Sequence, residues 1–277
     1  MTRFLHTGMG TALVAFCALV ISAPQAKADI QAIRNSDSEV WGSAGMSLFN
    51  YAEQIYAPNI PDSEHGWTPT IDAGVDYMTN SNWYYAFEGG VSFGSDHYNG
   101  SIFDFNTNHY DIPFQGSTNE TIGNVDGKVG HGFALGSMVM LTPYGELGYR
   151  YWDRSLGAGQ DETYHNFDML GGLMLQVAPT SRLILTGYGS AGTTFGGNMH
   201  AQATGDTYDL GNFAMYKFGG KVGFDLTKRW EIFTALDYDA FRYMKSPTVF
   251  NTNFSSFEPS SKTEDTTLRV GLGYHFR

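Results

Sequence analysis

Apolar and polar residues alternate with a period of two over most of the chain, and the pattern is clearest in its last ten residues. There Leu268, Val270, Leu272, Tyr274 and Phe276 fall on one face, and Thr267, Arg269 and His275 fall on the other. Successive side chains of a β-strand point to opposite faces, so this period predicts a strand that is apolar on one side and polar on the other.

Nine further segments follow the same rule and bring the predicted number of strands to ten. Six of them alternate clearly, at about 71–77, 83–93, 139–151, 167–177, 216–225 and 230–239. Three are weaker, at 40–51, 125–135 and 183–194, because glycine and alanine blur the pattern. For these three the sequence predicts a strand but leaves open which face is which.

The connections alternate between short and long. Short links are expected at 79–82, 136–138, 178–182 and 227–229, and long polar loops at 53–66, 95–124, 154–163, 195–212 and 244–264. Short turns at one end and long loops at the other are typical of barrels that cross a bacterial outer membrane. The predicted fold is an all-β, transmembrane, antiparallel up-and-down β-barrel of ten strands, with eight strands as the alternative.

The first 28 residues have the pattern of a secretory signal peptide. Arg3 is followed by an uncharged stretch over residues 8–21, and Ala26-Lys27-Ala28 provides a small-x-small cleavage site. An uncleaved anchor is less favoured, because the apolar run is short for a membrane span. We expect cleavage after Ala28, a single barrel domain over residues 29–277, and a location in the bacterial outer membrane.

Composition narrows the classes of function. The whole chain has a net charge of −12, and removal of residues 1–28 takes away Arg3 and Lys27 but no acid, so the exported chain carries −14. This charge argues against nucleic acid as a partner. Cys17 is the only cysteine and lies in the segment to be removed, which excludes disulfides and cysteine-bound metal from the exported protein.

The placement of aromatic residues indicates which face meets lipid. Tyr77, Trp83 and Trp230 lie on the apolar face near expected turns, as in the aromatic girdles of membrane barrels. Turning Lys217 or Arg269 toward the lipid midplane would cost roughly 2–4 kcal/mol each. The apolar face is therefore predicted to face lipid, and the charged face the lumen.

The charged face supplies the main candidate site, a lumen network of charges. It comprises Asp72, Asp76, Glu88, Glu146, Arg150, Asp168, Lys217, Lys221, Asp225, Asp237 and Arg269, together with Glu231 and Asp239. These groups either pair with one another to fill a narrow interior or line a path for small ions. Small barrels are filled by side chains, which favours the first interpretation.

The signal peptide, the strand-turn-loop rhythm and the segment Leu268–Phe276 resemble the small outer-membrane β-barrel superfamily, which groups OmpA-like barrels, opacity-type adhesins and porin-like proteins. The segment Leu141–Trp152 is also similar to a strand frequent in such proteins. The resemblance implies that Leu272, Tyr274 and Phe276 form an assembly signal for the barrel-assembly machinery, although Arg277 follows the phenylalanine. It also implies contact with outer-membrane lipid and lipopolysaccharide.

Catalytic motifs are missing from the sequence. Ten-stranded outer-membrane proteases, the omptins, use an aspartate pair and an Asp-x-His arrangement, and this chain has no Asp-x-His. It also has no Gly-x-Ser-x-Gly elbow. Histidines at 65, 97, 109, 165 and 200 show no close ligand spacing, so no metal site, cofactor or enzymatic activity is predicted.

The expected loops are the remaining place for function. Residues 95–124 contain several large apolar side chains among polar ones: Tyr98, Ile102, Phe103, Phe105, Tyr110 and Phe114. They suit a contact surface for a surface ligand, or they pack the loop onto itself. The leading hypothesis is a structural or adhesive barrel that acts through its extracellular loops. The alternatives are a narrow channel for ions or small solutes through the charged lumen and, less favoured, a membrane-embedded enzyme.

Overall fold

The computed structural model describes residues 30–104, 106–107, 109–156, 161–250 and 255–277. The predicted signal peptide, its cleavage site after Ala28, and Phe105 lie outside these residues, as does the side chain of Phe103. No helix among the described residues is long and apolar enough to cross a membrane.

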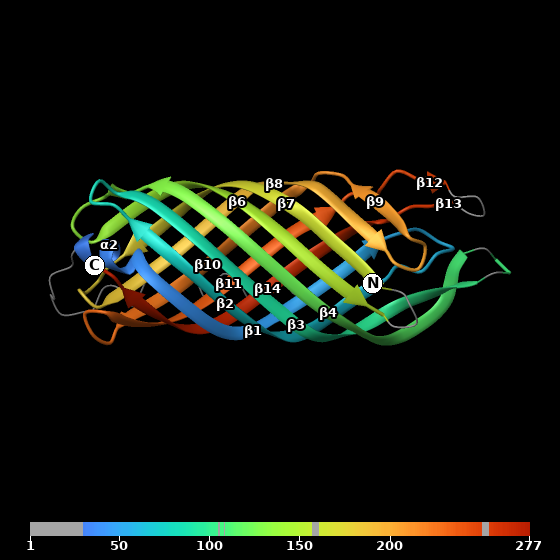
Figure 1. The fold of residues 1–277 in the computed structure, drawn as a ribbon, viewed down its shortest axis with the longest axis horizontal. Coiled ribbons are helices and arrows are strands. Elements are labelled where there is room, and N and C mark those ends of the chain that lie inside the picture. Colours follow the sequence, from blue (N-terminus) through green and yellow to red (C-terminus); the bar gives the residue numbers. More distant parts are fainter. Residues whose placement is uncertain (1–29, 105, 108, 157–160, 251–254) are drawn as a thin grey trace, which may run out of the picture.

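Ten long strands form a closed antiparallel barrel (Figure 1). They are β1 (Ser38–Gln54), β2 (Ser63–Met78), β3 (Trp83–Asp104), β4 (His109–His131), β6 (Val139–Ser155), β7 (Asp161–Val177), β8 (Leu183–Ala201), β10 (Ala214–Asp225), β11 (Trp230–Tyr243) and β14 (Ser260–His275). Each pairs with the next in this order, and β14 returns to pair with β1 from Glu39 opposite His275 to Gln54 opposite Ser260. The predicted ten-stranded up-and-down barrel is confirmed.

The remaining elements are short and lie at the two ends of the barrel. They are the helix α2 (Ile30–Ser36) and the strands β5 (Phe133–Ala134), β9 (Asp206–Leu210), β12 (Val249–Phe250) and β13 (Ser255–Ser256). Helix α2 and the C-terminus lie at the end with the short links, which we call the turn end; β9, β12 and β13 lie at the other end, the hairpin end (Figure 1).

The outer face is apolar along the strands and ends in aromatic side chains. Trp230, Tyr77 and Phe276 mark the turn end, and Leu236, Leu268 and Val270 lie further along, each 40% or more exposed in the isolated chain. The pairing of Leu236 with Leu268 and of Trp230 with Tyr274 extends this face across adjacent strands. Such a continuous apolar belt needs a nonpolar solvent.

The three weakly patterned strands take definite facings. In β1 the odd-numbered residues such as Trp41 and Phe49 are buried, whereas Val40 is exposed. In β4 the inner face carries Asp126 and Lys128. In β8 the buried residues are even-numbered as far as Thr194, and beyond a register shift the buried residue is Met199. The sequence could not assign these faces because both faces carry small or apolar residues.

The loops are shorter than predicted, because the strands continue into them. Most of residues 95–124 belongs to β3 and β4, which stay paired up to Asp104 opposite His109. Strands also extend into the predicted loops at 53–66, 154–163, 195–212 and 244–264. Beyond a membrane both faces of a hairpin meet water, so the strand continues through backbone hydrogen bonds without the apolar alternation that reveals it in sequence.

Candidate functional site: the filled lumen

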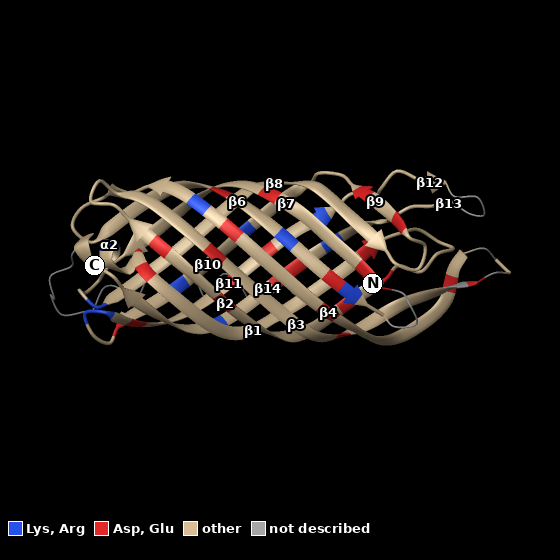
Figure 2. Cartoon of the chain, in the orientation of Figure 1, with Lys and Arg blue, Asp and Glu red and all other residues tan. Residues whose placement is uncertain are grey.

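The interior of the barrel contains layers of charged and aromatic side chains. Charged positions recur along the strands from one end to the other (Figure 2). At the hairpin end they border an aromatic cluster, and at the turn end they lie beneath α2. The ion pairs and packing within these layers decide whether the lumen is a path for ions or a packed core.

One cation organises the middle of the lumen. The Lys217 Nζ lies 2.7 Å from the Glu146 carboxylate, 2.8 Å from that of Asp126 and 3.7 Å from that of Asp168. These residues come from β10, β6, β4 and β7, so one ammonium links strands across the barrel. The side chains of Glu146 and Asp168 are only 2% exposed, and such buried carboxylates need a nearby cation.

Two more cations occupy the layer toward the turn end. Lys128 lies 2.5 Å from Glu88, and the Arg269 Nε lies 2.9 Å from the Asp237 carboxylate. Nearby Asp76 accepts hydrogen bonds from the Trp41 indole at 2.8 Å and the Tyr84 hydroxyl at 2.7 Å. Asp72 accepts weaker ones, from Thr70 at 3.3 Å and Ser43 at 3.5 Å.

The structure places all thirteen residues of the predicted network on the inner face, in several separate clusters. Glu146, Asp168 and Lys217 form one cluster, Arg150 pairs with Asp265 at 3.0 Å, and Lys221 and Asp225 belong to a cluster at the turn end. The sequence did not predict several other members of the lumen network: Glu39, Glu64, Asp96, Glu120, Asp126, Lys128, Arg154, Asp265 and His275. Most of these lie on strands whose facing it left open, or in stretches taken for loops.

Arg154 forms the charged centre of the hairpin end. Its Nε donates to the Glu64 carboxylate at 2.7 Å and its Nη1 to that of Glu162 at 2.5 Å, and its side chain is 1% exposed. The guanidinium also lies over the Tyr51 ring, 5.2 Å from its centroid. A planar guanidinium suits this position because it bonds two carboxylates and stacks on an aromatic ring at once.

Buried aromatic rings fill the lumen around Arg154. Trp152 stacks on Tyr164 with centroids 4.6 Å apart, Tyr164 stacks on Tyr243 at 5.6 Å, and Phe49 meets the edge of Trp152 at 5.2 Å. All of these point inward from different strands. An apolar plug was not predicted from the sequence, because the inner face was assigned to charged residues.

The chain between β11 and β14 adds to this closure. The Tyr164 hydroxyl donates to Glu258 at 2.9 Å, and the hydroxyls of Tyr208 and Ser256 share a hydrogen bond at 2.7 Å. Burial, reinforced by the charge of Glu162, raises the pKa of the Glu258 carboxyl to about 8. The described part of this segment thus contacts the lumen plug directly.

Helix α2 caps the turn end. Ile33 is fully buried against Met78, Met140 and Ala178, and the Arg34 Nε donates to the Asn82 amide oxygen at 2.9 Å. Asn82 has a φ of 64°, a left-handed conformation that asparagine tolerates in a tight turn.

The residue after α2 anchors the chain inside the lumen. The Gln176 side-chain amide donates to the Asp37 carboxyl at 2.6 Å, and burial raises the pKa of Asp37. The turn end is therefore closed by an apolar helix face and a buried polar contact.

A small cavity of about 90 Å³ lies between this cap and the middle layer. It has room for only a few water molecules. Its lining includes Asp37, Asp76, Glu88, Lys128, Lys221 and Arg269.

Two predictions about individual residues need correction. Tyr98, expected in a contact loop, points into the lumen and is 2% exposed. His65 and His97, expected to be scattered, lie opposite each other on β2 and β3 with ring centroids 5.3 Å apart. Strand pairing, which sequence spacing does not reveal, brings these two histidines together on the outer face.

Comparison with known proteins gives a structural match but no sequence match. No protein-family model matches the chain, and neither does any curated protein. Among solved structures, the outer membrane protease OmpT from Escherichia coli superposes with a TM-score of 0.63 at 10% identity, over 87% of this chain and 98% of that one. The chain has the fold of the small outer-membrane β-barrel proteins.

Other solved barrels match less well over the same range of the chain. The translocator domain of the autotransporter NalP from Neisseria meningitidis has a TM-score of 0.39 at 14% identity, over 96% of this chain and 94% of that one. Ail, the attachment invasion locus protein of Yersinia pestis, has a TM-score of 0.32 at 11% identity, over 87% of this chain and 99% of that one. Identities this low describe a fold and not an activity.

The outer-membrane fold orients the molecule. Short turns of such barrels face the periplasm and long hairpins face outward, and α2 lies at the end of this barrel that has the short turns. Among the described residues, the pairs within 4 Å that join a histidine to a carboxylate both involve His275, at the turn end. The hairpin end shows no such pair in the described part of the chain.

Proposed function

We propose that this protein is a closed outer-membrane barrel that binds a partner surface through its hairpin end, in a structural or adhesive role. The observation that carries the proposal is a set of large apolar side chains projecting into water there. Tyr56 is 89% exposed, Phe250 is 80% exposed and Phe114 is 42% exposed. Exposed apolar groups of this size, well away from the lipid belt, are typical of contact surfaces.

The filled lumen supports this proposal over the channel. An aromatic plug around Trp152 closes the hairpin end, and α2 closes the turn end. Between them Lys217 and Arg269 each lie within 3 Å of a carboxylate oxygen. An ion would have to displace these pairs as well as both plugs.

The length of β3 and β4 also supports a role outside the membrane. Their pairing runs from Trp83 opposite His131 at the turn end to Asp104 opposite His109. At about 3.4 Å per residue, a strand of 22 residues is far longer than the nine to eleven residues that roughly span a membrane. The excess length holds the tip of the hairpin away from the lipid surface.

An adhesion assay tests the proposal. The barrel is produced in a non-adhesive host bacterium, and binding to cultured epithelial cells and to neighbouring bacteria is counted. The test variant carries Tyr56→Ser, Phe114→Ser and Phe250→Ser. We expect binding to fall at least tenfold, since the anchors of an interface each contribute about 2 kcal/mol or more.

A matched control removes an exposed apolar side chain from the opposite end. Leu226 is 51% exposed at the turn end, so Leu226→Ser should leave adhesion unchanged. Equal binding by the triple variant and the parent, with both proteins folded and surface-displayed, would contradict the proposal. So would an absence of adhesion by the parent to every cell type.

A further inference from the structure

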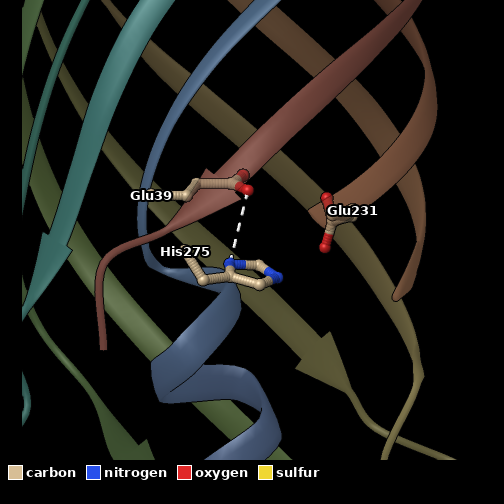
Figure 3. Close-up of side chains that lie close together, drawn as sticks. All are labelled: Glu39, Glu231 and His275. Carbon is tan, nitrogen blue, oxygen red and sulfur yellow. Dashed lines mark ion pairs between the residues drawn. The ribbon is translucent and has the colours of Figure 1, made fainter. Parts of the chain in front are cut away.

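The clearest unexplained group of side chains lies where the barrel closes at its turn end. Glu39 on β1, Glu231 on β11 and His275 on β14 point toward one another from three adjacent strands (Figure 3). The register accounts for this, because Glu39 pairs with His275 across β1 and β14. One ligand atom from each of the three lies within 4.8 Å of the others, and each residue is at most 1% exposed.

Two glycines make room for the carboxylates. A Cβ on Gly273 would lie 1.9 Å from the Glu39 Oε2, and one on Gly223 would lie 2.6 Å from the Glu231 carboxylate. Any other residue at either position would force a carboxylate out of the group. The space is thus shaped around these two side chains.

The imidazole is oriented by a fourth residue. The His275 Nε2 lies 2.9 Å from the Asp225 carboxylate and donates to it in the tautomer that protonates Nε2. That tautomer leaves the lone pair of Nδ1 directed at the Glu39 Oε2, 3.6 Å away. Neither Nδ1 nor this oxygen has a hydrogen-bond partner among the described residues. An imidazole held by a carboxylate through its far nitrogen is the usual arrangement of a metal-binding histidine.

The charges around the group call for a cation beyond the one present. Lys221 lies 2.6 Å from Glu39 and 2.7 Å from Glu231. With a neutral imidazole, its single positive charge faces the carboxylates of Glu39, Glu231 and Asp225, so two negative charges stay uncompensated. A divalent cation would balance them.

A second carboxylate group in the lumen provides a contrast. Asp126, Glu146 and Asp168 also lie close together, but Lys217 reaches all three of them. In that group one ammonium lies within 3.7 Å of every carboxylate, and no imidazole takes part. The group at the turn end instead keeps an imidazole nitrogen and a carboxylate oxygen facing each other without a partner.

We infer that Glu39, Glu231 and His275 bind a Zn²⁺ ion or a similar transition-metal dication, with Asp225 orienting the histidine. One imidazole nitrogen and two carboxylate oxygens are ligands that suit Zn²⁺, whereas Ca²⁺ and Mg²⁺ prefer oxygen alone. The ion would join β1, β11 and β14 beside the helix cap, since the Ser36 hydroxyl donates to the Glu231 Oε2 at 3.1 Å. It would act as a clamp on the strands that close the barrel.

The test is a Zn²⁺ titration of the folded, detergent-solubilised barrel against a chromophoric chelator after treatment with EDTA. The test variants are Glu39→Gln and His275→Phe, and Asp225→Asn serves as a milder variant that keeps all three ligands. We expect one Zn²⁺ per barrel in the parent, no stoichiometric binding by the first two variants, and binding weakened roughly 10- to 100-fold by Asp225→Asn.

A matched control removes the histidine pair on the outer face. His65→Asn with His97→Asn should leave the stoichiometric site intact. Binding that survives Glu39→Gln but disappears in this double variant would overturn the inference, as would a parent that binds no Zn²⁺ and keeps only a proton on the imidazole. Stoichiometric Ca²⁺ binding that excludes Zn²⁺ would overturn it as well.

A spectroscopic measurement on the parent guards against variants that fail to fold. Co²⁺ bound through one nitrogen and two oxygens in a site of low coordination absorbs visible light much more strongly than solvated Co²⁺ does, and Zn²⁺ should abolish this added absorption. A parent whose Co²⁺ spectrum stays that of the solvated ion contradicts the inference. A rise in the unfolding midpoint with Zn²⁺, absent in Glu39→Gln, is the expected effect on stability.

Discussion

The two ends of the lumen are closed in different ways. At the hairpin end, rings from several strands stack around Arg154, whose guanidinium bonds Glu64 and Glu162. At the turn end, a helix of seven residues covers a group of carboxylates that a single lysine only partly neutralises. The hairpin-end plug is built from the barrel strands themselves, whereas the turn-end cap is a separate piece of chain.

This difference assigns different mechanical roles to the two closures. Removing a ring from the hairpin end disturbs the strands, because each ring is a side chain of a barrel strand. Displacing α2 breaks a local contact through Ile33 and Arg34 but leaves the strand pairing in place. We therefore expect global stability to depend on the hairpin end, and local opening to occur at the turn end.

The largest effect is expected from Arg154→Met. The variant leaves the buried carboxylate of Glu64 and the partly exposed carboxylate of Glu162 without their cation, which should lower the free energy of unfolding by roughly 3–5 kcal/mol. Urea unfolding in lipid vesicles, followed by circular dichroism, measures it. Arg182 is exposed in a turn, so Arg182→Met should change the value by less than about 0.5 kcal/mol. Similar losses in both variants would show that the buried cluster has no special importance.

Trp152→Ala should lower the free energy of unfolding almost as much as Arg154→Met does. Trp152 is 1% exposed at the centre of the aromatic cluster, and its removal leaves a cavity that costs roughly 3–5 kcal/mol. Trp230→Ala is the control, since Trp230 faces outward and is 48% exposed. In detergent micelles Trp230→Ala should lower the free energy of unfolding by less than Trp152→Ala does. A larger loss in Trp230→Ala would contradict the proposed role of the hairpin-end plug.

Ile33→Asp should release α2 with little loss of global stability. A charge on this fully buried position disfavours docking of the helix. A cysteine introduced by Ser36→Cys, at a residue 5% exposed, reports the change, because it should react with a maleimide much faster once the cap is displaced. Unchanged labelling, or a loss of global stability as large as that of Trp152→Ala, would mean that the two ends do not differ in this way.

The smallest expected effect on global stability concerns pH, because it acts on the opening of one segment at the hairpin end. The pKa of the Glu258 carboxyl rises from an ordinary value of 4.5 to about 8 in the folded state, so the folded protein retains a proton that the open chain releases. Closure of this segment is therefore most stable below about pH 4.5 and weakens as the pH rises toward 8. The equilibrium constant for opening rises by at most about tenfold per pH unit.

Limited proteolysis of residues 244–259 across this range measures the opening. Glu258→Gln has no such proton and should open to the same extent at every pH in this window. A parent whose cleavage rate does not vary with pH, or varies in the opposite direction, would contradict the assignment.

The sequence predicts the barrel well because the lipid belt imposes a rule on every strand. Residues such as Leu268 and Leu272 must face outward, and the residues between them must then face the lumen. Beyond the belt the rule ends, which is why the hairpin formed by β3 and β4 resembled a loop and Tyr98 was placed in it.

The lumen is less predictable because its contacts join strands that are distant in sequence. Lys217 meets Asp126 across 91 residues, and Arg154 meets Glu64 across 90. Alternation identifies residues that face inward but does not reveal which of them meet. The aromatic plug shows a second limit, since Trp152 and Tyr164 are apolar residues on a face expected to be polar.

Single-channel recording in planar bilayers tests the central claim, that side chains close the lumen at both ends. We predict no stepwise conductance for the parent, and none for Ile33→Asp alone, because the hairpin-end plug remains in place. A combined Ile33→Asp and Trp152→Ala variant is the one in which a conductance is expected. Regular stepwise conductance by the parent, abolished by Lys217→Ala, would contradict the account and identify the charged lumen as an ion path.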